Sequence, residues 1–257
     1  MLFSLETYGI IKKKAEEIRL LIIDPHIHLL PKLGDGPADE AEAERMLIFL
    51  QKAGVVSAIC VTHLDTTRMQ DRFFFTRRVR DAQTALNLIQ KKIRSHIRLF
   101  YSFEVDYEPG LFSNVDMSPY RIPGTDLLPV NFPIGVFDDR DMIEFSQLIH
   151  RQHLRPLICH FERHILMPSN AKEKLLGIFA CEYLITSTSL LFRPIQDVLQ
   201  RSTLDKRTYY VCSNAHNATT RAPLLTEEEM RLSGMFQHAL LKKLLQSNTV
   251  LYRKLIK

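Results

Sequence analysis

Residues 21–30 read LIIDPHIHLL and place two histidines two positions apart, directly after an apolar run. Alternate residues of an extended strand point to the same side, so His26 and His28 can be directed at one point, and Asp24 can share that side. Two imidazoles directed at one point suit a metal ion. The alternative is that one histidine belongs to a loop and the other lies on the surface, because short motifs often match by chance.

The same residue types recur where other apolar runs end. Five of the ten histidines stand at such ends with two carboxylates, and the set is His26, His28, Asp35, His63, Glu104, His160 and His216. Imidazole and carboxylate ligands without thiolate suit manganese, iron or zinc. More ligands than one ion takes imply two or three ions, and we expect Glu104 to bridge them. The other histidines are predicted on the surface or in loops: His96, His150, His153, His164 and His238.

These side chains come from distant parts of the chain, so secondary-structure elements must bring them together. Seven apolar runs are predicted as strands, over 20–24, 56–62, 97–105, 127–132, 155–160, 181–186 and 207–213. Helical patterns lie between them, over 38–53, 70–95, 139–153, 170–178 and 193–201. A last helix is predicted over 227–245, beginning with a Thr226/Glu229 capping box and ending in Lys242 and Lys243. This alternation indicates parallel strands, and their number favours an α/β barrel with its site at the carboxyl ends of the strands.

The composition narrows the class of protein. The chain has 257 residues, of which 46% are hydrophobic and 25% charged, as in ordinary globular domains. We predict one domain over 20–257, preceded by a helical extension over 1–19. A net charge of +5 without aromatic interleaving predicts no nucleic-acid partner. No apolar run predicts a transmembrane segment. Four cysteines without metal-binding spacing are expected in the core, in a reducing compartment, and the predicted location is the cytoplasm.

Six segments in chain order resemble the PHP (polymerase and histidinol phosphatase) superfamily. Within it, they are most similar to the bacterial protein-tyrosine phosphatases of capsular and exopolysaccharide synthesis. The matching segments are Asp24-Pro-His26-Ile-His28, Gly34-Asp35-Gly36-Pro37, Val61-Thr62-His63, Phe103-Glu104, Pro156-Leu-Ile-Cys-His160-Phe-Glu162-Arg163, and Ser213-Asn214-Ala-His216-Asn217 with the later Arg221. The resemblance covers most of the chain, and the order of the segments makes it specific.

The resemblance implies a distorted, TIM-like (β/α)7 barrel that hydrolyses phosphotyrosine on a bacterial tyrosine kinase of polysaccharide export. It implies manganese as the metal, in two or three ions, with iron, zinc and magnesium as alternatives. It extends the ligand set to Asn131 and Asn214, and it assigns Arg163 and Arg221 to the phosphate oxygens. Without it, Arg163 could pair with Glu162 on the surface, and Arg221 could be a solvated loop charge.

Two amides depart from the family pattern. Asn214 stands where the family carries an aspartate ligand, and Asn131 stands where its fourth strand ends in a carboxylate or histidine. Amides bring no charge, so Asp35 and Glu104 alone must offset four to six positive charges. Insufficiently compensated buried charge is costly, so we predict reduced metal occupancy, with one position weak or empty.

Three functions stay open at this point. The first is a protein-tyrosine phosphatase that works by in-line attack of a hydroxide bridging the metal ions. The second is another phosphoesterase with a small phosphorylated metabolite as substrate. The third is a degenerate member that binds phosphotyrosine or a partner protein without turnover.

Glu162 is predicted to orient an imidazole, and Asp24 either does the same or lies on the surface. Whether the chain forms a homo-oligomer is left open.

Overall fold

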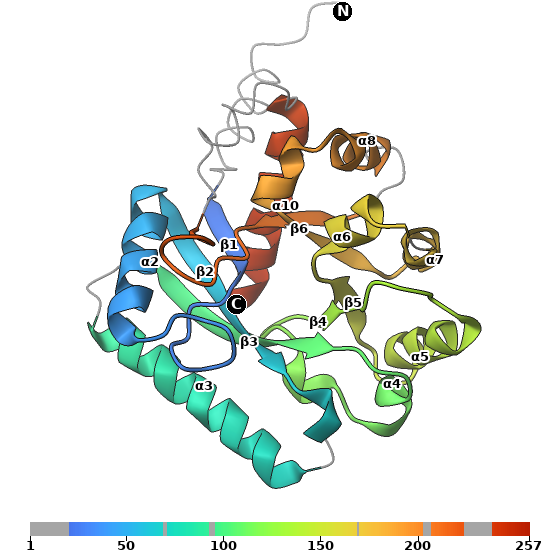
Figure 1. The fold of residues 1–257 in the computed structure, drawn as a ribbon, viewed down its shortest axis with the longest axis horizontal. Helices are drawn as coiled ribbons and strands as arrows, with labels where there is room; N and C mark the ends of the chain where they lie inside the picture. The colour runs from blue at the N-terminus through green and yellow to red at the C-terminus, as the bar shows by residue number, and fades with distance from the viewer. Residues whose placement is uncertain (1–20, 69–70, 93–95, 169, 203–206, 224–237) are drawn as a thin grey trace, which may run out of the picture.

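The computed structural model describes residues 21–68, 71–92, 96–168, 170–202, 207–223 and 238–257. Within these ranges, seven strands lie at the centre and helices surround them (Figure 1). The strands are β1 (Ile22–Ile27), β2 (Val55–Leu64), β3 (Arg98–Asp106), β4 (Leu127–Asn131), β5 (Arg155–Ile158), β6 (Glu182–Thr186) and β7 (Tyr209–Cys212). Each of the seven predicted strands is therefore present. The predicted extension over 1–19 and the Thr226/Glu229 capping box lie outside the described residues.

The helices follow the predicted pattern with two additions. The predicted ones are α2 (Glu40–Lys52), α3 (Arg72–Lys92), α5 (Asp139–His150), α7 (Ala171–Gly177), α8 (Arg193–Ser202) and α10 (His238–Leu255). Short helices α4 (Leu111–Asn114) and α6 (Phe161–Leu166) were not predicted, and 3-10 turns occupy Thr66–Arg68, Ser118–Tyr120 and Ser187–Leu191. The predicted end of the last helix near Lys243 is wrong. Because Leu251 is still fully buried, α10 continues to Leu255.

All six pairs of neighbouring strands are parallel, in the order β1 to β7. Asn248 of α10 bridges the seam between the first and last strands: its amide donates to the carbonyls of Ile23 (3.0 Å) and Val211 (2.7 Å) and accepts from the Val211 N–H (3.2 Å). Nearer the site, the Asn214 N–H donates to the His26 carbonyl at 3.1 Å. These bonds bring β7 against β1, and the sheet forms a nearly closed barrel.

The substitution Asn248→Leu is expected to destabilise the protein by about 2–4 kcal/mol, because three buried backbone groups at the seam lose their partners. Unfolding in urea, followed by circular dichroism, measures the change. Ser247→Ala is the matched control, since the Ser247 hydroxyl bonds the Lys243 carbonyl within the same helix, and it should change the free energy by less than about 0.5 kcal/mol. Equal stability of the Asn248→Leu variant and the wild type would show that the seam does not depend on this amide.

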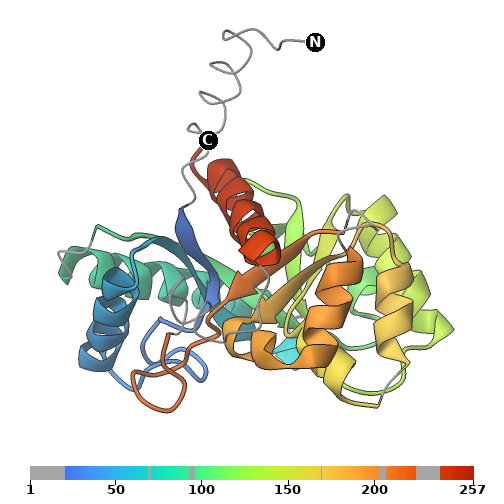
Figure 2. The same cartoon turned by 90° about the horizontal axis from the view of Figure 1, so that it is seen from above.

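Alternate residues of β2 face two separate apolar clusters. In β2, Ile59 and Val61 belong to a small cluster that also draws on β4, β5, β6 and β7, so this cluster is the barrel interior. Ala58 and Cys60 belong to the large cluster beneath the surrounding helices. Leu251 joins the interior cluster from α10, which packs across one end of the barrel (Figure 2). The loops that follow β1 and β7 lie together at the opposite end (Figure 2).

The four cysteines are free and buried, as predicted. Cys159 and Cys212 lie in the barrel interior, where burial raises the pKa of both thiols well above the usual value. A neutral, buried thiol is a packing residue rather than a nucleophile.

The first strand runs through Pro25 to Ile27, whereas the predicted strand ended at residue 24, directly before the proline. The register of β1 against β2 is irregular between Asp24 and Ile27, which pair with Ala58 and Cys60. Three steps along β1 thus match two along β2, as in a bulge, where a missing N–H is tolerated. This irregularity lets the strand carry His26 up to the mouth of the barrel.

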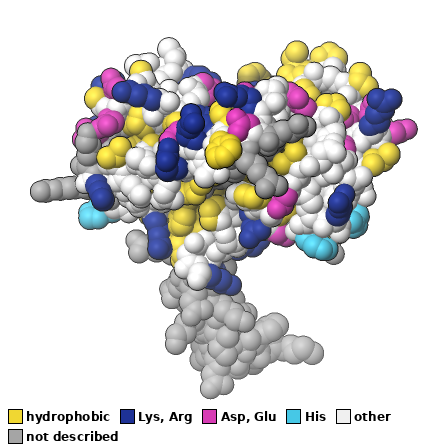
Figure 3. Space-filling model, turned by 90° about the horizontal axis from the view of Figure 1, so that it is seen from below, with side chains coloured by type: hydrophobic (Ala, Val, Ile, Leu, Met, Phe, Trp, Pro, Cys, Tyr) yellow, Lys and Arg dark blue, Asp and Glu magenta, His cyan; other side chains and the backbone are white. Residues whose placement is uncertain are grey.

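The surface carries charges of both signs. On the face shown in Figure 3, lysine and arginine side chains are interspersed with aspartate and glutamate, and hydrophobic side chains lie between them. The net positive charge is therefore not gathered into one basic patch on that face. Among the described helices, none is long and apolar enough to span a membrane.

Candidate metal centre

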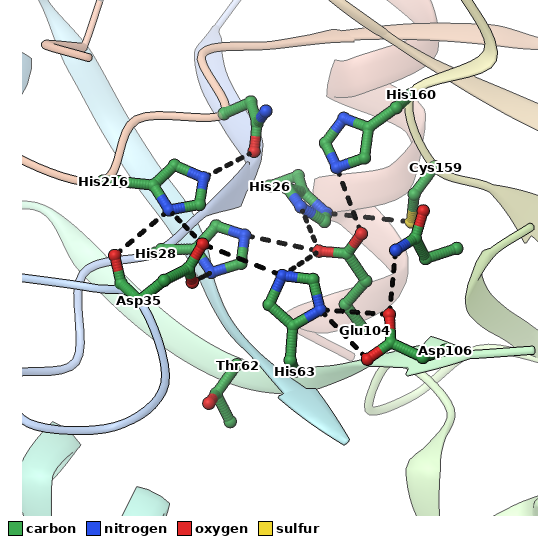
Figure 4. Close-up of polar contacts among 12 residues, drawn as sticks. His26, His28, Asp35, Thr62, His63, Glu104, Asp106, Cys159, His160 and His216 are labelled. Carbon is green, nitrogen blue, oxygen red and sulfur yellow. Dashed lines mark hydrogen bonds and ion pairs between the residues drawn. The ribbon is translucent and has the colours of Figure 1, made fainter. Parts of the chain in front are cut away.

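The carboxyl ends of the strands bring the predicted ligands together. His26 lies in β1, His63 in β2 and Glu104 in β3, while His160 and His216 closely follow β5 and β7. Figure 4 shows these side chains pointing toward one another from different strands. The ring centroids of His28 and His216 are 3.9 Å apart, and those of His28 and His63 are 5.1 Å apart. The predicted convergence of these residues on one pocket is thus present.

Glu104 is the centre of the cluster and is fully buried. Its Oε2 lies 3.1 Å from Nε2 of His26, 3.3 Å from Nε2 of His28 and 3.8 Å from Nε2 of His63. Its Oε1 lies 3.0 Å from Nε2 of His160. Burial alone raises the pKa of the Glu104 carboxyl, but the charge of His26 and the contact with His160 hold the pKa well below its usual value. Glu104 is therefore an anion that four imidazoles share.

Asp35 forms a second anionic position at the rim. Its carboxylate lies 3.0 Å from Nδ1 of His28 and 2.8 Å from Nδ1 of His216. Gly34 precedes it with φ of +71°, and a Cβ there would stand 3.2 Å from the Thr62 hydroxyl. A glycine is therefore needed to turn this loop toward the histidines.

Two non-glycine residues of the site adopt left-handed backbone conformations. His160 has φ of 53° and Asn214 has φ of 50°. Such conformations are uncommon for residues other than glycine, although asparagine and histidine adopt them more readily than most. At His160 the turn ends β5, begins α6 and directs the imidazole at Glu104. At Asn214 it sets the side-chain oxygen 3.2 Å from Nε2 of His216.

The donor set fits divalent ions. Two ligands at about 2.1 Å from one ion and at a right angle lie about 3.0 Å apart, which matches the closest nitrogen–oxygen pairs around Glu104. Two groups of ligand atoms lie within 4.8 Å of one another: His26, His28 and Glu104, and His28, Asp35 and His216. Both nitrogens of His28 and both oxygens of Glu104 are buried without an aligned hydrogen-bond partner in the described part of the chain. Buried polar atoms that face one another in this way are suited to hold a cation between them.

His28 belongs to both groups, which limits the occupancy. A neutral imidazole has one lone pair, so His28 can complete one group at a time. The second group then keeps Asp35 and His216 and needs further ligands. The weak or empty position stays a prediction.

Arg221, one of the two arginines assigned to phosphate, lies at the edge of the cluster. The Arg221 Nη1 stands 3.9 Å from Asp35, and the Asn217 side chain accepts the Arg221 N–H at 2.9 Å, which fixes the loop. Burial lowers the pKa of Arg221, Asp35 opposes that shift, and the positive charge of Arg163 adds to it. Arg163 is exposed, whereas Glu162 is buried and bonds Thr186, so the alternative surface pairing of the two is not seen among the described residues.

Three side chains differ from their predicted roles. Glu162 bonds the hydroxyl and N–H of Thr186 instead of orienting an imidazole. Asp24 is fully buried, and it accepts bonds from Ser213 and the His26 N–H, so it ties β1 to the segment after β7. Burial raises its pKa to about 7, although these bonds oppose the shift. His164 is buried rather than exposed, because α6 turns it inward.

Asn131 was predicted as a site residue, whereas Asp106, to which it bonds, was not. The Asn131 amide donates to Asp106 at 2.8 Å, and Nδ1 of His63 lies 3.1 Å from the same carboxylate. The contact with Asp106 is the main reason that the pKa of His63 is raised to about 9. Asp106 was missed because the predicted strand stopped one residue before it. Its position two residues after Glu104 was the available signal, since alternate strand residues share a face.

The fold and the site define a parallel α/β barrel with a histidine–carboxylate cluster, suited to divalent ions, at the carboxyl ends of its strands. A family model described as capsular polysaccharide synthesis, CpsB/CapC, matches residues 22–252. The chain therefore belongs to the CpsB/CapC family, and the predicted family is confirmed.

The chain is also similar to solved structures. A chain from the crystal structures of YwqE from Bacillus subtilis and CpsB from Streptococcus pneumoniae, described as unique metal-dependent tyrosine phosphatases, matches with a TM-score of 0.66 and 20% identity. The match covers 90% of this chain and 94% of the other. A phosphotriesterase homology protein from Escherichia coli, with phosphate in its active site, matches at a TM-score of 0.46 and 11% identity, over 89% and 97% of the two chains. The first match confirms the predicted distorted (β/α)7 barrel.

Proposed function

We propose that this chain is a metal-dependent phosphomonoester hydrolase, and specifically a cytoplasmic protein-tyrosine phosphatase acting on a bacterial tyrosine kinase of polysaccharide assembly. The observation that carries the proposal is the convergence of His26, His28, His63 and His160 on the buried Glu104. Membership of a family of capsular polysaccharide synthesis supports the biological setting. The likeness to metal-dependent tyrosine phosphatases supports the substrate class. The free, buried cysteines support a reducing compartment.

The residues proposed to hold the metal are His26, His28, Asp35, His63, Glu104, Asn131, His160, Asn214 and His216. Manganese is the proposed metal, in two or three ions, because imidazole, carboxylate and amide donors without thiolate suit it. Glu104 is proposed to bridge, since its two oxygens contact histidines from different strands. We further propose that residues 20–257 act as one catalytic domain.

The reaction needs activated water and a bound phosphate. The metal ions supply Lewis acidity, which makes water nucleophilic near neutral pH and stabilises charge on the departing oxygen. Arg163 and Arg221 are proposed to hold the phosphate oxygens, because the guanidinium fork matches two oxygens at once. Cys159 and Cys212 are buried, and the raised pKa of each thiol keeps it neutral, so neither cysteine competes with water as a nucleophile.

The substitution Asn214→Asp is expected to raise metal content and activity several-fold, because it adds a negative charge 3.2 Å from Nε2 of His216. Metal analysis of the purified protein and manganese-dependent hydrolysis measure the two effects. Asn87→Asp is a control of equal charge change at an exposed position of α3, and it should alter neither quantity. An Asn214→Asp variant that behaves like the wild type would remove Asn214 from the ligand set.

A substrate comparison tests the proposed class. With Mn²⁺ present, we expect the protein to hydrolyse a phosphotyrosine peptide with a kcat/KM at least tenfold higher than for histidinol phosphate. The reverse preference would indicate a phosphoesterase of small metabolites. Tight binding of the phosphopeptide without phosphate release would indicate a binding protein, for which the two amides at positions 131 and 214 would be the reason.

A further inference from the structure

Asp106 is a carboxylate of the site that the ligand set leaves out. It is the last residue of β3 and lies two positions after Glu104, so both side chains leave the strand on the same side. Its side chain is 39% exposed, whereas Glu104 is fully buried. Asp106 thus stands at the rim of the pocket whose centre is Glu104.

The carboxylate of Asp106 faces the outer nitrogen of His63. Its Oδ1 lies 3.1 Å and its Oδ2 3.3 Å from Nδ1 of His63. The other nitrogen, Nε2, faces the cluster, 3.8 Å from Glu104 and 3.9 Å from Asp35. Because an ionised carboxylate can only accept, Nδ1 of His63 keeps its hydrogen, and Nε2 is the nitrogen left to bind an ion once its own proton is displaced. Figure 4 shows the ring between the two carboxylates.

His63 needs such a partner more than the other histidines do. Its side chain is 31% exposed, against 1% for His26 and His28, 4% for His160 and 6% for His216. Packing therefore restrains its ring least. A hydrogen bond to the outer nitrogen is the remaining way to fix both the tautomer and the direction of the ring.

Asn131, at the end of the neighbouring strand β4, bonds Asp106. Asp106 and Asn131 are paired in the register of β3 and β4, and the amide donates to Oδ1 of Asp106 at 2.8 Å. A carboxylate at position 131 would repel Asp106 at this distance, whereas an amide holds it in place. The neutral residue at the end of β4 and the acidic residue at the end of β3 are therefore complementary.

We propose that Asp106 is a positioning residue of the metal centre: held by Asn131, it accepts the Nδ1 hydrogen of His63 and directs Nε2 of that ring toward the ions. It also adds a third negative charge beside Asp35 and Glu104. This inference rests on the proposed function, because it assumes that the cluster binds metal. Asp106 acts through His63 and touches neither the substrate nor the reacting atoms.

The test is a double-mutant cycle read by metal affinity. Mn²⁺ binding is measured by titration calorimetry for the wild type, Asp106→Asn, His63→Ala and the double variant. The substitution Asp106→Asn keeps the shape of the side chain, and the melting temperature of each metal-free variant checks the fold. Glu108→Gln is the matched control, because Glu108 lies two residues further along the chain and is exposed.

We expect Asp106→Asn to weaken Mn²⁺ binding 10- to 100-fold, the usual effect of losing a partner that orients a metal-binding histidine. Glu108→Gln should stay within twofold of the wild type. The double variant should bind no more weakly than His63→Ala alone, since Asp106 acts through that ring. Unchanged affinity of the Asp106→Asn variant, or effects that multiply in the double variant, would overturn the inference. Failure of the wild type to bind Mn²⁺ would overturn the proposed function together with it, and is distinguishable on that ground.

Discussion

Glu104→Gln is expected to abolish phosphotyrosine hydrolysis, with kcat/KM falling by about a thousandfold or more, equivalent to about 4 kcal/mol. The carboxylate is fully buried and lies within 3.3 Å of nitrogens of His26, His28 and His160. The amide removes its negative charge and replaces one oxygen by a donor that cannot bind a cation. The metal content of the purified variant should fall as well.

The loss is expected to arise at the site rather than from unfolding. Gln has the shape of Glu, so the circular dichroism spectrum should match that of the wild type, and His160→Ala should give the same loss of activity with the fold intact. Glu44→Gln is the control, since Glu44 is exposed on α2. Retention of more than a tenth of the activity by the Glu104→Gln variant would remove Glu104 from its bridging role.

Removal of metal is the second change with a large expected effect. After treatment with a chelator and dialysis, we expect no measurable hydrolysis, and addition of Mn²⁺ should restore it. The cluster gathers imidazoles around two carboxylates, and its facing atoms lack aligned partners in the described residues. An ion that binds the folded state alone stabilises it by about 4 kcal/mol at a thousand times its Kd. In a domain of this size that corresponds to roughly 10 °C in Tm.

A thermal denaturation series with increasing Mn²⁺ measures this stabilisation. The Glu104→Gln variant is the control, because its melting temperature should respond little to the ion. Hydrolysis that survives the chelator, with a melting temperature independent of Mn²⁺, would mean that the histidine cluster has another purpose.

Much of the fold was predictable because strands and helices differ in period. The seven apolar runs sit where the strands are, since buried parallel strands are short and continuously apolar. The end of α10 was misplaced because Lys242 and Lys243 resemble a helix end, whereas the buried Leu251 keeps the helix going to Leu255. Pro25 suggested the end of a strand, but the bulge tolerates it. Whether a strand can accommodate a proline depends on its register with the neighbouring strand.

The candidate site was predictable where residue type alone carries the information. His26, His28, His63 and His160 follow or end apolar runs, and the barrel brings those ends together. Which side chains bond to each other was not predictable, because that depends on distances between residues of different strands. Asp24 bonds Ser213 across the seam, and Asp106 contacts His63, although both aspartates stand at or directly after the end of a predicted strand. Asn248 looks like an ordinary helix residue, and its role emerges only when β1 and β7 meet on either side of it.

The most direct test is hydrolysis of a phosphotyrosine peptide by the purified wild-type protein, with and without Mn²⁺, on a sample whose bound metal is counted by mass spectrometry. We predict at least one divalent ion per chain and phosphate release that rises at least tenfold with Mn²⁺. A chain that carries no metal after equilibration with Mn²⁺, and releases no phosphate from the peptide, would contradict the proposal that these histidines and carboxylates form a catalytic metal centre.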